Sequence, residues 1–370
     1  MYGSFRISKS VLQGMLTKIA PALMVNSSRP ILQCVELEGD DRGTLKMSAT
    51  KLDTSMILYF PSTVSVDPFK VVFPYKKLRD IVAKSDPGDL EVTITDGVAT
   101  ILSGAAAWEL QLPSGESFPD IPEIEKYQEV DRSAFRDAFE LVRKSASLDV
   151  IRPSLRMIHL SKAKMTACDG VKFTQMAMSD EFPYDLEIDI SSNSADVVLH
   201  FLKEDGTLEI GQTSSHLGIR SESGTLILSK PTSSYPNVEQ IMLRPALENK
   251  SLLIVDRSEL LKAVQRVRLN ADPATDAVGL SISAKSVTIS ARDMLGNSAT
   301  ETIAADWTSK DRVVVVSWVL FTQLLSNFAN AECQILLGED TKSRKSVILM
   351  KDTTGLVSLI PQMSGNIKVF

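Results

Sequence analysis

The sequence predicts an α+β fold made of three tandem copies of one β-rich domain, each with two helices and roughly eight short strands. Two observations support this prediction. Short motifs recur at three places along the chain of 370 residues, and repeats this long form whole domains instead of solenoid units. Segments with helical periodicity are separated by segments in which apolar and polar residues alternate, as in half-buried strands. We expect domains at residues 1–125, 126–250 and 251–370.

A tetrapeptide precedes the first helix of each copy. Val130-Asp131-Arg132-Ser133 recurs as Val255-Asp256-Arg257-Ser258, and Ile7-Ser8-Lys9-Ser10 occupies the matching place in the first copy. The helical segments that follow are expected at 11–16, 134–139 and 259–264. Because a serine oxygen can accept a hydrogen bond from an amide of the first turn, the expected N-caps are Ser10, Ser133 and Ser258.

A second helix, a strand end and a connector also recur. The second helices are expected at 75–82, 195–202 and 319–325. Strands of alternating polarity end at Ala49-Thr50-Lys51, Ala167-Cys168-Asp169 and Ala291-Arg292-Asp293. Because proline lacks the amide donor that a strand ladder needs, connectors are expected at Ser117-Phe118-Pro119-Asp120 and Ser234-Tyr235-Pro236-Asn237.

The composition indicates a globular cytoplasmic protein. Hydrophobic residues make up 44% and charged residues 23%, which are ordinary values for a folded soluble chain. Cys34, Cys168 and Cys333 lie far apart in the sequence, which predicts reduced thiols. Residues 1–6 contain no apolar signal core, and the most apolar stretch, 313–325, is shorter than the roughly 20 residues of a membrane span. We therefore expect no membrane contact.

The sequence lacks the motifs of common enzyme classes. It has no glycine-rich phosphate loop and no Gly-x-Gly-x-x-Gly pattern. His159, His200 and His216 have no neighbouring His or Cys at metal-binding spacing, and the first two are expected to be hydrogen-bonded structural residues. No local nucleophile elbow supports a Ser/His/Asp site. The sequence thus predicts no catalytic residues, no metal site and no cofactor.

Positive charge gathers on the predicted helices although the chain is acidic, with 40 Lys and Arg against 46 Asp and Glu. Segments 8–20, 73–84, 131–146 and 256–268 each carry more cations than acids. Solvated surface helices commonly carry Lys and Arg, but the recurrence favours one shared basic surface that suits a phosphate backbone. Segment 73–84 contains the second helix of the first repeat. Because the second helices of the second and third repeats lack this excess of cations, the basic surface is expected to be uneven.

The order and spacing of these motifs resemble the bacterial DNA polymerase sliding clamp family, the beta subunit of DNA polymerase III, over nearly the whole chain. Ala167-Cys168-Asp169-Gly170-Val171-Lys172-Phe173 matches the family's usual Ala-Thr-Asp-Gly-His-Arg-Leu at its Ala, Asp and Gly. Phe118-Pro119-Asp120 and Tyr235-Pro236-Asn237 are similar to the family's Phe-Pro-Asp connectors. Residues 357–363 are similar to its last strand, which has a proline near the end.

The resemblance implies a head-to-tail homodimer that closes into a ring of six domains, with helices inside around duplex DNA and sheets outside. Such a ring holds DNA by enclosure, through contacts that do not read sequence. The implied dimer contact places Trp108 and Leu110 of one protomer against Leu269 of the other protomer. The candidate DNA-binding residues are Lys9, Lys18, Arg29, Lys76, Lys77, Arg79, Arg136, Arg143, Arg152, Lys262, Arg266 and Arg268.

The resemblance also implies a pocket between the second and third copies that takes short peptides ending in apolar or aromatic residues. Its candidate residues are Leu155, Asp169, Gly170, Val171, Lys172, Phe173, Pro236, Gln240, Ile241, Ser317, Leu320, Ser346, Ser358, Ile360, Pro361 and Gln362. Val171, Lys172 and Phe173 stand where the family usually has His, Arg and Leu, so we expect a more apolar rim with fewer bidentate hydrogen bonds. Residues 367–370 loosely resemble such a peptide, which raises the hypothesis that they occupy a pocket in cis or on a neighbour.

The predicted function is that of a DNA sliding clamp, a processivity factor without catalytic residues. Its expected partners are duplex DNA, the replicative DNA polymerase, the clamp loader and other proteins that carry clamp-binding peptides. Two alternatives stay open: a clamp-fold protein-binding scaffold without a replicative role, and an enzyme with an unrecognised active site in a β-rich chain. Equivalent domains around a hole would favour the clamp, whereas a cleft with converging titratable residues would favour the enzyme.

Overall fold

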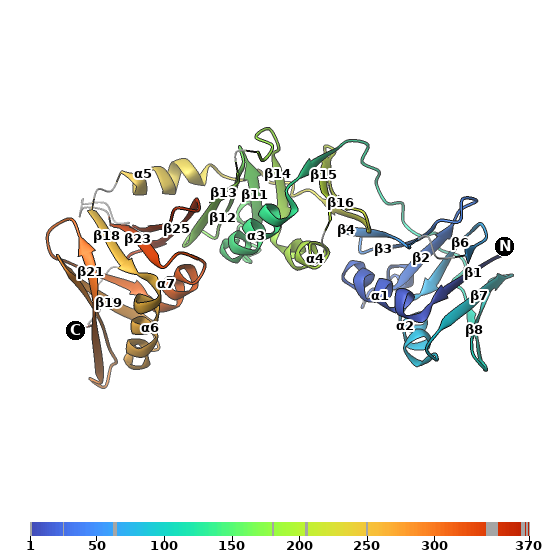
Figure 1. The fold of residues 1–370 in the computed structure, drawn as a ribbon, viewed down its shortest axis with the longest axis horizontal. Helices are drawn as coiled ribbons and strands as arrows, with labels where there is room; N and C mark the ends of the chain where they lie inside the picture. Colours follow the sequence, from blue (N-terminus) through green and yellow to red (C-terminus); the bar gives the residue numbers. More distant parts are fainter. Residues whose placement is uncertain are drawn as a thin grey trace. The chain divides into compact units, whose positions relative to one another are not determined.

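The computed structural model describes residues 2–24, 26–61, 65–179, 181–203, 206–248, 251–337, 347–363, 367 and 369, without the side chains of residues 2, 65 and 66. The chain divides into two compact units. Unit 1 comprises Met1–Arg136 with Ser194–Lys230, and unit 2 comprises Asp137–Asn193 with Pro231–Phe370. Each unit combines helices with antiparallel sheets, which confirms the predicted α+β class (Figure 1).

Unit 1 contains two antiparallel sheets. The five-stranded sheet has the order β5 (Ser65–Val66), β1 (Tyr2–Ser8), β7 (Asp89–Thr95), β8 (Val98–Ser103) and β9 (Ala106–Gln111). The eight-stranded sheet has the order β10 (Tyr127–Val130), β15 (Leu208–Gln212), β16 (His216–Ser221), β17 (Gly224–Ser229), β4 (Thr54–Tyr59), β3 (Leu45–Thr50), β2 (Cys34–Gly39) and β6 (Phe69–Pro74). Their strands alternate as predicted; β7, for example, buries Leu90, Val92 and Ile94 and exposes the residues between them.

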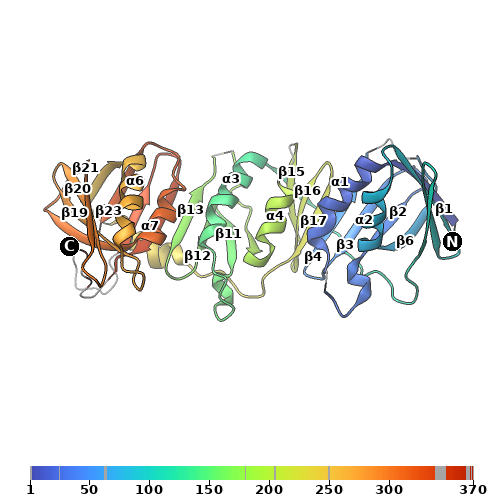
Figure 2. The same ribbon diagram turned by 90° about the horizontal axis from the view of Figure 1, so that it is seen from below.

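Three helices cover one side of these sheets: α1 (Lys9–Ile19), α2 (Tyr75–Lys84) and α4 (Ala195–Phe201). In Figure 2 they lie in front of the unit 1 strands. The buried side chains of α1 are Leu12, Leu16 and Ile19, which share one helical face, and α1 packs against α2 through this side of the unit. The cationic side chains of both helices stay outside the core.

Unit 2 is built on one antiparallel sheet of twelve strands. Its order is β14 (Ile188–Ser191), β11 (Met157–Ser161), β12 (Lys164–Cys168), β13 (Phe173–Ala177), β25 (Leu356–Pro361), β24 (Val347–Lys351), β23 (Glu332–Leu337), β18 (Ser251–Asp256), β21 (Ser298–Trp307), β20 (Ser286–Arg292), β19 (Ala277–Ser283) and β22 (Arg312–Ser317). The helices α5 (Arg244–Leu247), α6 (Arg257–Val267) and α7 (Trp318–Leu325) belong to this unit, while α3 (Arg132–Val142) begins in unit 1 and ends in unit 2. The α6 and α7 faces with Leu260, Val264, Phe321 and Leu325 form its main core.

The repeats join through one recurring strand pair. In unit 1 the last strand of the second copy, β17, pairs with the fourth strand of the first copy, β4. In unit 2 the last strand of the third copy, β25, pairs with the fourth strand of the second copy, β13. The last strand of the first repeat, β9, and the fourth strand of the third repeat, β21, have no such partner. One edge of β9, and one edge of β21 over residues 298–303, pair with no strand in the described part of the chain.

The predicted helices are confirmed, but their N-caps are two residues earlier than expected. The oxygen that accepts the first-turn amide belongs to Ser8 in α1, at 3.3 Å from Val11 N, and to Asp256 in α6, at 2.8 Å from Glu259 N. In α3 Asp131 accepts from Ala134 N at 3.0 Å, and Ser133 only donates to that carboxylate. Ser10, Ser133 and Ser258 therefore do not cap, because an earlier residue already does so: Ser8 and Asp256 end the preceding strands, and Asp131 directly follows β10.

The second helices, strand ends and connectors also lie where they were predicted. Helices α2, α4 and α7 fall on 75–82, 195–202 and 319–325 to within two residues, and β3, β12 and β20 end at the repeated marker. The connectors contain no regular element at 112–126 or 231–237. The boundaries 1–125, 126–250 and 251–370 stay a prediction, because the shared sheets group the described strands into two units, not three.

Candidate functional site

Three exposed predicted DNA-binding cations of unit 1 lie on α2. Lys76 and Lys77 are exposed and have no side-chain partner among the described residues. Arg79 pairs with Asp80 at 2.8 Å, and this carboxylate raises the pKa of the guanidinium. Lys9 Nζ donates to the Ser85 carbonyl oxygen at 2.5 Å, just after α2 ends. Lys9 therefore also helps to cap the C-terminus of α2. Two free lysines on one turn are thus available to a ligand.

A cleft of about 670 Å³ lies between α1 and α4 in unit 1. Lys18 lines it, donates to Ser223 Oγ at 2.6 Å and lies 5.5 Å from the centre of the Phe201 ring. His200 and Lys203, which were not in the predicted set, line the same cleft. The signal that could have found Lys203 is its position just after the second helix of its repeat, where it is the only Lys or Arg of residues 195–203.

The remaining predicted cations have varied surroundings. In unit 2, Lys262 is exposed on α6 and has no side-chain partner among the described residues, whereas Arg266 forms an ion pair with Glu301. Arg268 stacks 4.2 Å from the Trp318 ring centre, and the half-buried Arg143 follows α3 directly. In unit 1, Arg136 is a half-buried residue of α3.

Two predicted DNA-binding arginines do not lie on a helix. Arg29 precedes a short 3₁₀ turn and forms an ion pair with Glu116 at 2.6 Å. Arg152 lies beside the predicted peptide pocket, since a Cβ added to Gly170 would come within 2.8 Å of Arg152 Nη1. The sequence could not reveal this position, because the two residues are brought together only by the fold. DNA binding by all twelve cations stays a prediction.

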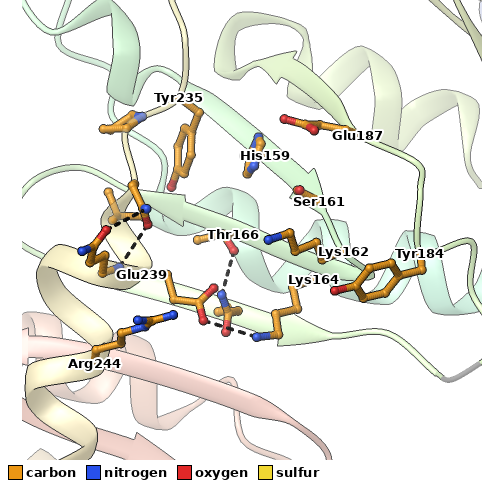
Figure 3. Close-up of a pocket in the computed structure, with 15 residues that line it drawn as sticks. His159, Ser161, Lys162, Lys164, Thr166, Tyr184, Glu187, Tyr235, Glu239 and Arg244 are labelled. Atoms are coloured by element: carbon orange, nitrogen blue, oxygen red, sulfur yellow. Dashed lines mark hydrogen bonds and ion pairs between the residues drawn. The ribbon is translucent and has the colours of Figure 1, made fainter.

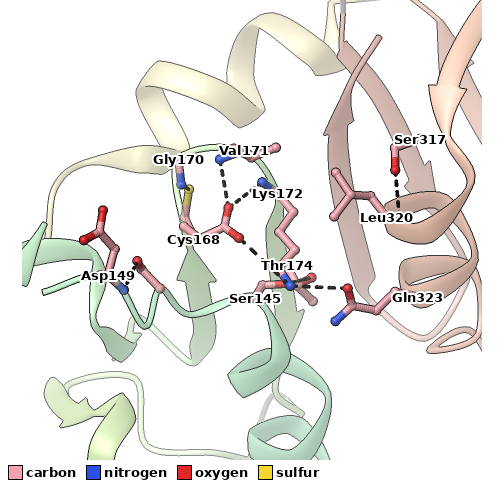
Figure 4. Close-up of polar contacts among 12 residues, drawn as sticks. Ser145, Asp149, Cys168, Gly170, Val171, Lys172, Thr174, Ser317, Leu320 and Gln323 are labelled. Atoms are coloured by element: carbon pink, nitrogen blue, oxygen red, sulfur yellow. Dashed lines mark hydrogen bonds and ion pairs between the residues drawn. The ribbon is translucent and has the colours of Figure 1, made fainter. Parts of the chain in front are cut away.

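The turn that carries the family-like motif is tightly built. Asp169 Oδ1 accepts from Val171 N at 2.8 Å and from Lys172 N at 2.7 Å, and Gly170 N donates to Cys168 Sγ at 3.2 Å (Figure 4). Gly170 has φ +90°, a conformation that side chains disfavour, and an added Cβ would also lie 3.5 Å from Leu155 Cδ1. The turn therefore requires glycine and presents Val171, which is 45% exposed, to solvent.

Lys172 connects this turn to the third copy. Its side chain is 12% exposed, and its Nζ donates to Gln323 Oε1 of α7 at 3.3 Å (Figure 4). Asp169 Oδ2 lies 4.0 Å from the same nitrogen. Burial lowers the pKa of Lys172 although Asp169 opposes the shift. The lysine therefore packs between the turn before β13 and α7 and is not a freely extended group on the pocket rim.

The other predicted pocket residues divide into an interior set and a surface set. Phe173, Ser358 and Ile360 are buried, and Ser358 Oγ lies 3.3 Å from Thr174 Oγ1. The half-buried members are Leu155, Pro236, Ser317, Leu320, Pro361 and Gln362. Gln240 and Ile241 are exposed, and Ser346 lies outside the described residues. Beneath them an apolar cluster contains Phe173 and Leu359, with Leu155 and Tyr235 packed against it. The pocket as a whole stays a prediction.

The predicted dimer residues occupy the free strand edge and a helix end. Trp108 is half-buried and Leu110 is 9% exposed in β9, whereas Leu269, just after α6, is 78% exposed. The C-terminal Ile367 lines a cleft with Asp272 and with the turn between β20 and β21, none of which belongs to the predicted peptide pocket. Lys368 and Phe370 lie outside the described residues.

His159 bears out the expectation of a structural histidine. Its Nδ1 lies 2.8 Å from Asp189 Oδ1, and its ring stacks on Tyr235 with centres 4.7 Å apart. Within the described ranges, no group of three or more His, Cys, Asp or Glu side chains is arranged to hold a metal ion. In the same ranges, no helix combines the length and apolar character that crossing a bilayer requires.

The fold is that of the sliding clamps. Solved clamps from C. crescentus and Bacillus subtilis align with a TM-score of 0.88 at 17% and 18% identity, covering 99% of this chain and 100% of each of those chains. A clamp from Pseudomonas aeruginosa, solved with griselimycin, aligns with a TM-score of 0.87 at 16% identity and the same coverage.

Sequence comparison defines the family more narrowly. Residues 3–122 match the DNA polymerase III beta subunit N-terminal domain, and residues 245–355 match its C-terminal domain. The beta sliding clamp of Synechococcus elongatus is 25% identical over 291 residues, which are 72% of this chain and 74% of that protein. The chain belongs to the DNA polymerase III beta subunit family, the sliding clamps, which are processivity factors.

Proposed function

We propose that two copies of this chain close head to tail into a ring around duplex DNA and tether the replicative polymerase and other partners to it. The ring has no catalytic role of its own and works in the cytoplasm. Partners, including the clamp loader, bind through short peptides at the predicted pocket around Leu155, Gly170 and Leu320. Family membership supports this reading over a scaffold without a replicative role and over an enzyme.

The pairing pattern of the repeats carries the proposal. In unit 1 the last strand of the second repeat, β17, pairs with the fourth strand of the first repeat, β4. In unit 2 the last strand of the third repeat, β25, pairs in the same way with the fourth strand of the second repeat, β13. Only β9 and β21 of this pattern lack such a partner among the described strands. Pairing β9 of one protomer with β21 of its partner would complete the same kind of sheet, and a dimer would contain two such pairs. A head-to-tail dimer with both pairs formed is a closed ring.

Repeat equivalence also predicts the register of this contact. Ala106 follows the two-residue turn of its hairpin opposite Ser103, as Gly224 does opposite Ser221. Ser298 of β21 pairs with Arg292 of β20, just as Ser55 of β4 pairs with Thr50 of β3, so Ser298 and Ser55 are equivalent positions of the two repeats. By this equivalence Ala107 corresponds to Thr225 and Thr300 corresponds to Ile57. Since Thr225 lies opposite Ile57 in the β17·β4 pair, Ala107 of one protomer should lie opposite Thr300 of its partner.

A disulfide test follows from this register. The double variant Ala107→Cys/Thr300→Cys should form a covalent dimer on mild oxidation, because directly opposed residues meet the distance that a disulfide needs. The native Cys34, Cys168 and Cys333 are at most 4% exposed and do not compete. The read-out is non-reducing electrophoresis combined with solution mass, which should be about twice the 40.5 kDa of the chain.

The shifted pair Ala107→Cys/Thr302→Cys is the matched control, since it lies on the same two strands but out of register and should cross-link poorly. Each single variant should stay monomeric under denaturing conditions. A ladder of higher species would indicate an open chain of subunits instead of a closed ring, and a monomer without cross-links would contradict the dimer altogether.

The cations support the DNA part of the proposal. Lys76, Lys77 and Lys262 are exposed and lack a side-chain partner among the described residues, and Lys18 and Lys203 line one cleft. Phosphate contacts of this kind bind without reading bases, which suits a ring that slides. The test is retention: the protein, loaded on nicked circular duplex by a clamp loader, should be released when the circle is cut, whereas ordinary groove binding would survive the cut.

A further inference from the structure

A polar cleft of about 360 Å³ lies on the face of unit 2 where the second connector crosses the sheet. We call it the connector cleft. Its floor consists of outward-facing side chains from β11, β12 and β13, and its wall consists of residues 235–240 (Figure 3). Lys162, at the turn between β11 and β12, Arg244, at the start of α5, and Tyr184 and Glu187 complete the lining.

Cations outnumber acids in this cleft. Lys162, Lys164 and Arg244 line it together with Glu187 and Glu239. Lys164 Nζ already lies 3.4 Å from Glu239 Oε1, which balances those two charges. Lys162 and Arg244 are exposed and have no ion-pair partner among the described residues, so their charges are available to a ligand. The Nδ1 of His159, which also lines the cleft, already contacts Asp189 Oδ1 at 2.8 Å.

The turn that holds Lys162 is backbone-strained. Ser161 pairs with Lys164, which leaves Lys162 and Ala163 as a two-residue turn with φ +52° and +53°. Such turns usually contain Asn or Gly, because other side chains disfavour this region. Strained positions of this kind persist where the surrounding structure requires them, often at binding sites. Here the strain places a free lysine at the mouth of the cleft.

The walls of the connector cleft are fixed by internal contacts. The Tyr235 ring stacks on His159 with an interplanar angle of 11°, and Gln175 Nε2 donates to Thr166 Oγ1 at 3.1 Å. Asn237 Nδ2 donates to Gln240 Oε1 at 3.1 Å, which stiffens the connector. A site whose side chains are already held in place loses less entropy when a ligand binds.

We propose that the connector cleft binds an acidic segment of a partner peptide whose apolar end occupies the predicted pocket; this rests on the proposed function. Pro236 and Gln240 belong to the predicted pocket and also line the cleft, so the two sites are continuous along the connector. The carboxylates of the peptide would meet Lys162 and Arg244. Because Glu187 and Glu239 interrupt the cations, a continuous phosphate backbone fits less well than a peptide that can alternate acidic and neutral residues.

The test compares two synthetic peptides that share one apolar end, Leu-Phe, and differ only before it. One carries three aspartates and the other three serines. Fluorescence anisotropy should show that the full-length protein binds the acidic peptide about three- to tenfold more tightly at low salt, the range for a few partly exposed ion pairs. Added salt should reduce this ratio, because it screens exposed charges.

The double variant Lys162→Asn/Arg244→Gln should bring the ratio close to one. Asparagine tolerates the strained turn, so the variant removes charge without disturbing the backbone. Lys310→Asn, an exposed lysine that does not line the cleft, is the matched control and should keep the wild-type ratio. Equal binding of both peptides to the wild-type protein, or a ratio that survives in the double variant, overturns the proposal.

The serine peptide separates this proposal from the proposed function. If it binds the wild-type protein and the double variant equally, the pocket is intact and only the acidic preference is in question. If neither peptide binds the wild-type protein, the predicted pocket and the connector-cleft proposal are both wrong. Binding of duplex DNA in place of the acidic peptide, lost in the double variant, would assign the cleft to nucleic acid and also overturn the proposal.

Discussion

One buried thiol, that of Cys333, is expected to make the stability of this protein depend on alkaline pH. Cys333 lies in β23 with no exposed surface, and burial, with a smaller effect from the Asp352 carboxylate, raises the pKa of its thiol from 9.0 to about 12. The unfolded chain therefore releases this proton first. The stabilisation from the neutral thiol is complete below pH 9.0 and is lost progressively as the pH rises toward about 12.

We expect Cys333→Ala to flatten the alkaline decline in stability. One group with this shift removes about 1.4 kcal/mol of unfolding free energy per pH unit above pH 9. Denaturant unfolding at about pH 8 and about pH 10 should thus show a smaller difference for the variant than for the wild type by about 1.4 kcal/mol. The variant is less stable at both pH values because it leaves a small cavity. Equal pH differences would contradict the assignment.

The strained turn at Lys162 and Ala163 gives a second residue-scale prediction. With φ +53°, Ala163 has a conformation that glycine adopts without a steric penalty. Ala163→Gly should raise the unfolding free energy by about 1 kcal/mol, measured by denaturant titration. The matched control is Ala134→Gly in α3, where the same change removes helix propensity and should lower stability by about 1 kcal/mol. A loss of stability in both variants would mean that the turn is not strained.

At the residue scale the sequence predicted types of residue better than their contacts. The three tetrapeptides located the helix starts, but the caps proved to be Ser8, Asp131 and Asp256, because the cap is the residue just before the helix, whose position depends on where the preceding strand ends. Lys172 was predicted as a rim residue. Its burial depends on Gln323, a residue of a different copy, and no local pattern reveals that contact.

At the scale of elements, the first connector lies on a floor of glycines. Gly211 of β15 and Gly218 of β16 are paired directly, and a Cβ on either would collide with the connector segment at 124–127. For Gly211 the obstacles are the Lys126 carbonyl oxygen and, at 2.9 Å, Ile124 Cγ2. Neither has a positive φ, so close approach, not backbone conformation, explains these glycines.

Gly211→Ala should therefore destabilise unit 1 by about 1–3 kcal/mol, because a backbone carbonyl cannot move aside as a side chain can. Gly14→Ala is the control of opposite sign: Gly14 lies inside α1, and no atom beyond its chain neighbours and the backbone of its own helix lies within 4 Å of an added Cβ, so alanine should stabilise the helix by about 1 kcal/mol. Denaturant unfolding measures both. An unchanged stability for Gly211→Ala would show that the connector moves freely on the sheet.

Helices were easier to predict than sheets for a physical reason. The periodicity that defines α2 or α7 lies within one segment, whereas the pairs β17·β4 and β13·β25 join strands from different copies. Alternating polarity identifies a strand but not its neighbour. Three sequence repeats thus became two compact units, since each shared sheet ties part of the second copy to a different neighbour.

At the scale of the whole molecule, the predicted DNA-binding cations differ in whether a carboxylate already pairs with them. The chain has a net charge of −6, yet Lys76, Lys77 and Lys262 remain exposed and without a side-chain partner among the described residues. The predicted cations are unequal, because Arg29, Arg79 and Arg266 are already paired with carboxylates. Sequence alone could count charges on a helix, but it could not say which of them an acidic neighbour neutralises.

This inequality leads to a prediction about DNA binding. Lys76→Ala/Lys77→Ala should lower the affinity for duplex DNA modestly and should reduce the slope of log K against log salt by about 1 for each lysine that contacts a phosphate. Arg79→Ala is the matched comparison on the same helix; since Asp80 already neutralises much of its charge, it should change the slope less. The measurement is anisotropy of a labelled duplex over a range of salt. A slope that the double variant leaves unchanged would remove α2 from the DNA-facing surface, and the same slope change for Arg79→Ala would mean that the Asp80 pair opens when DNA binds.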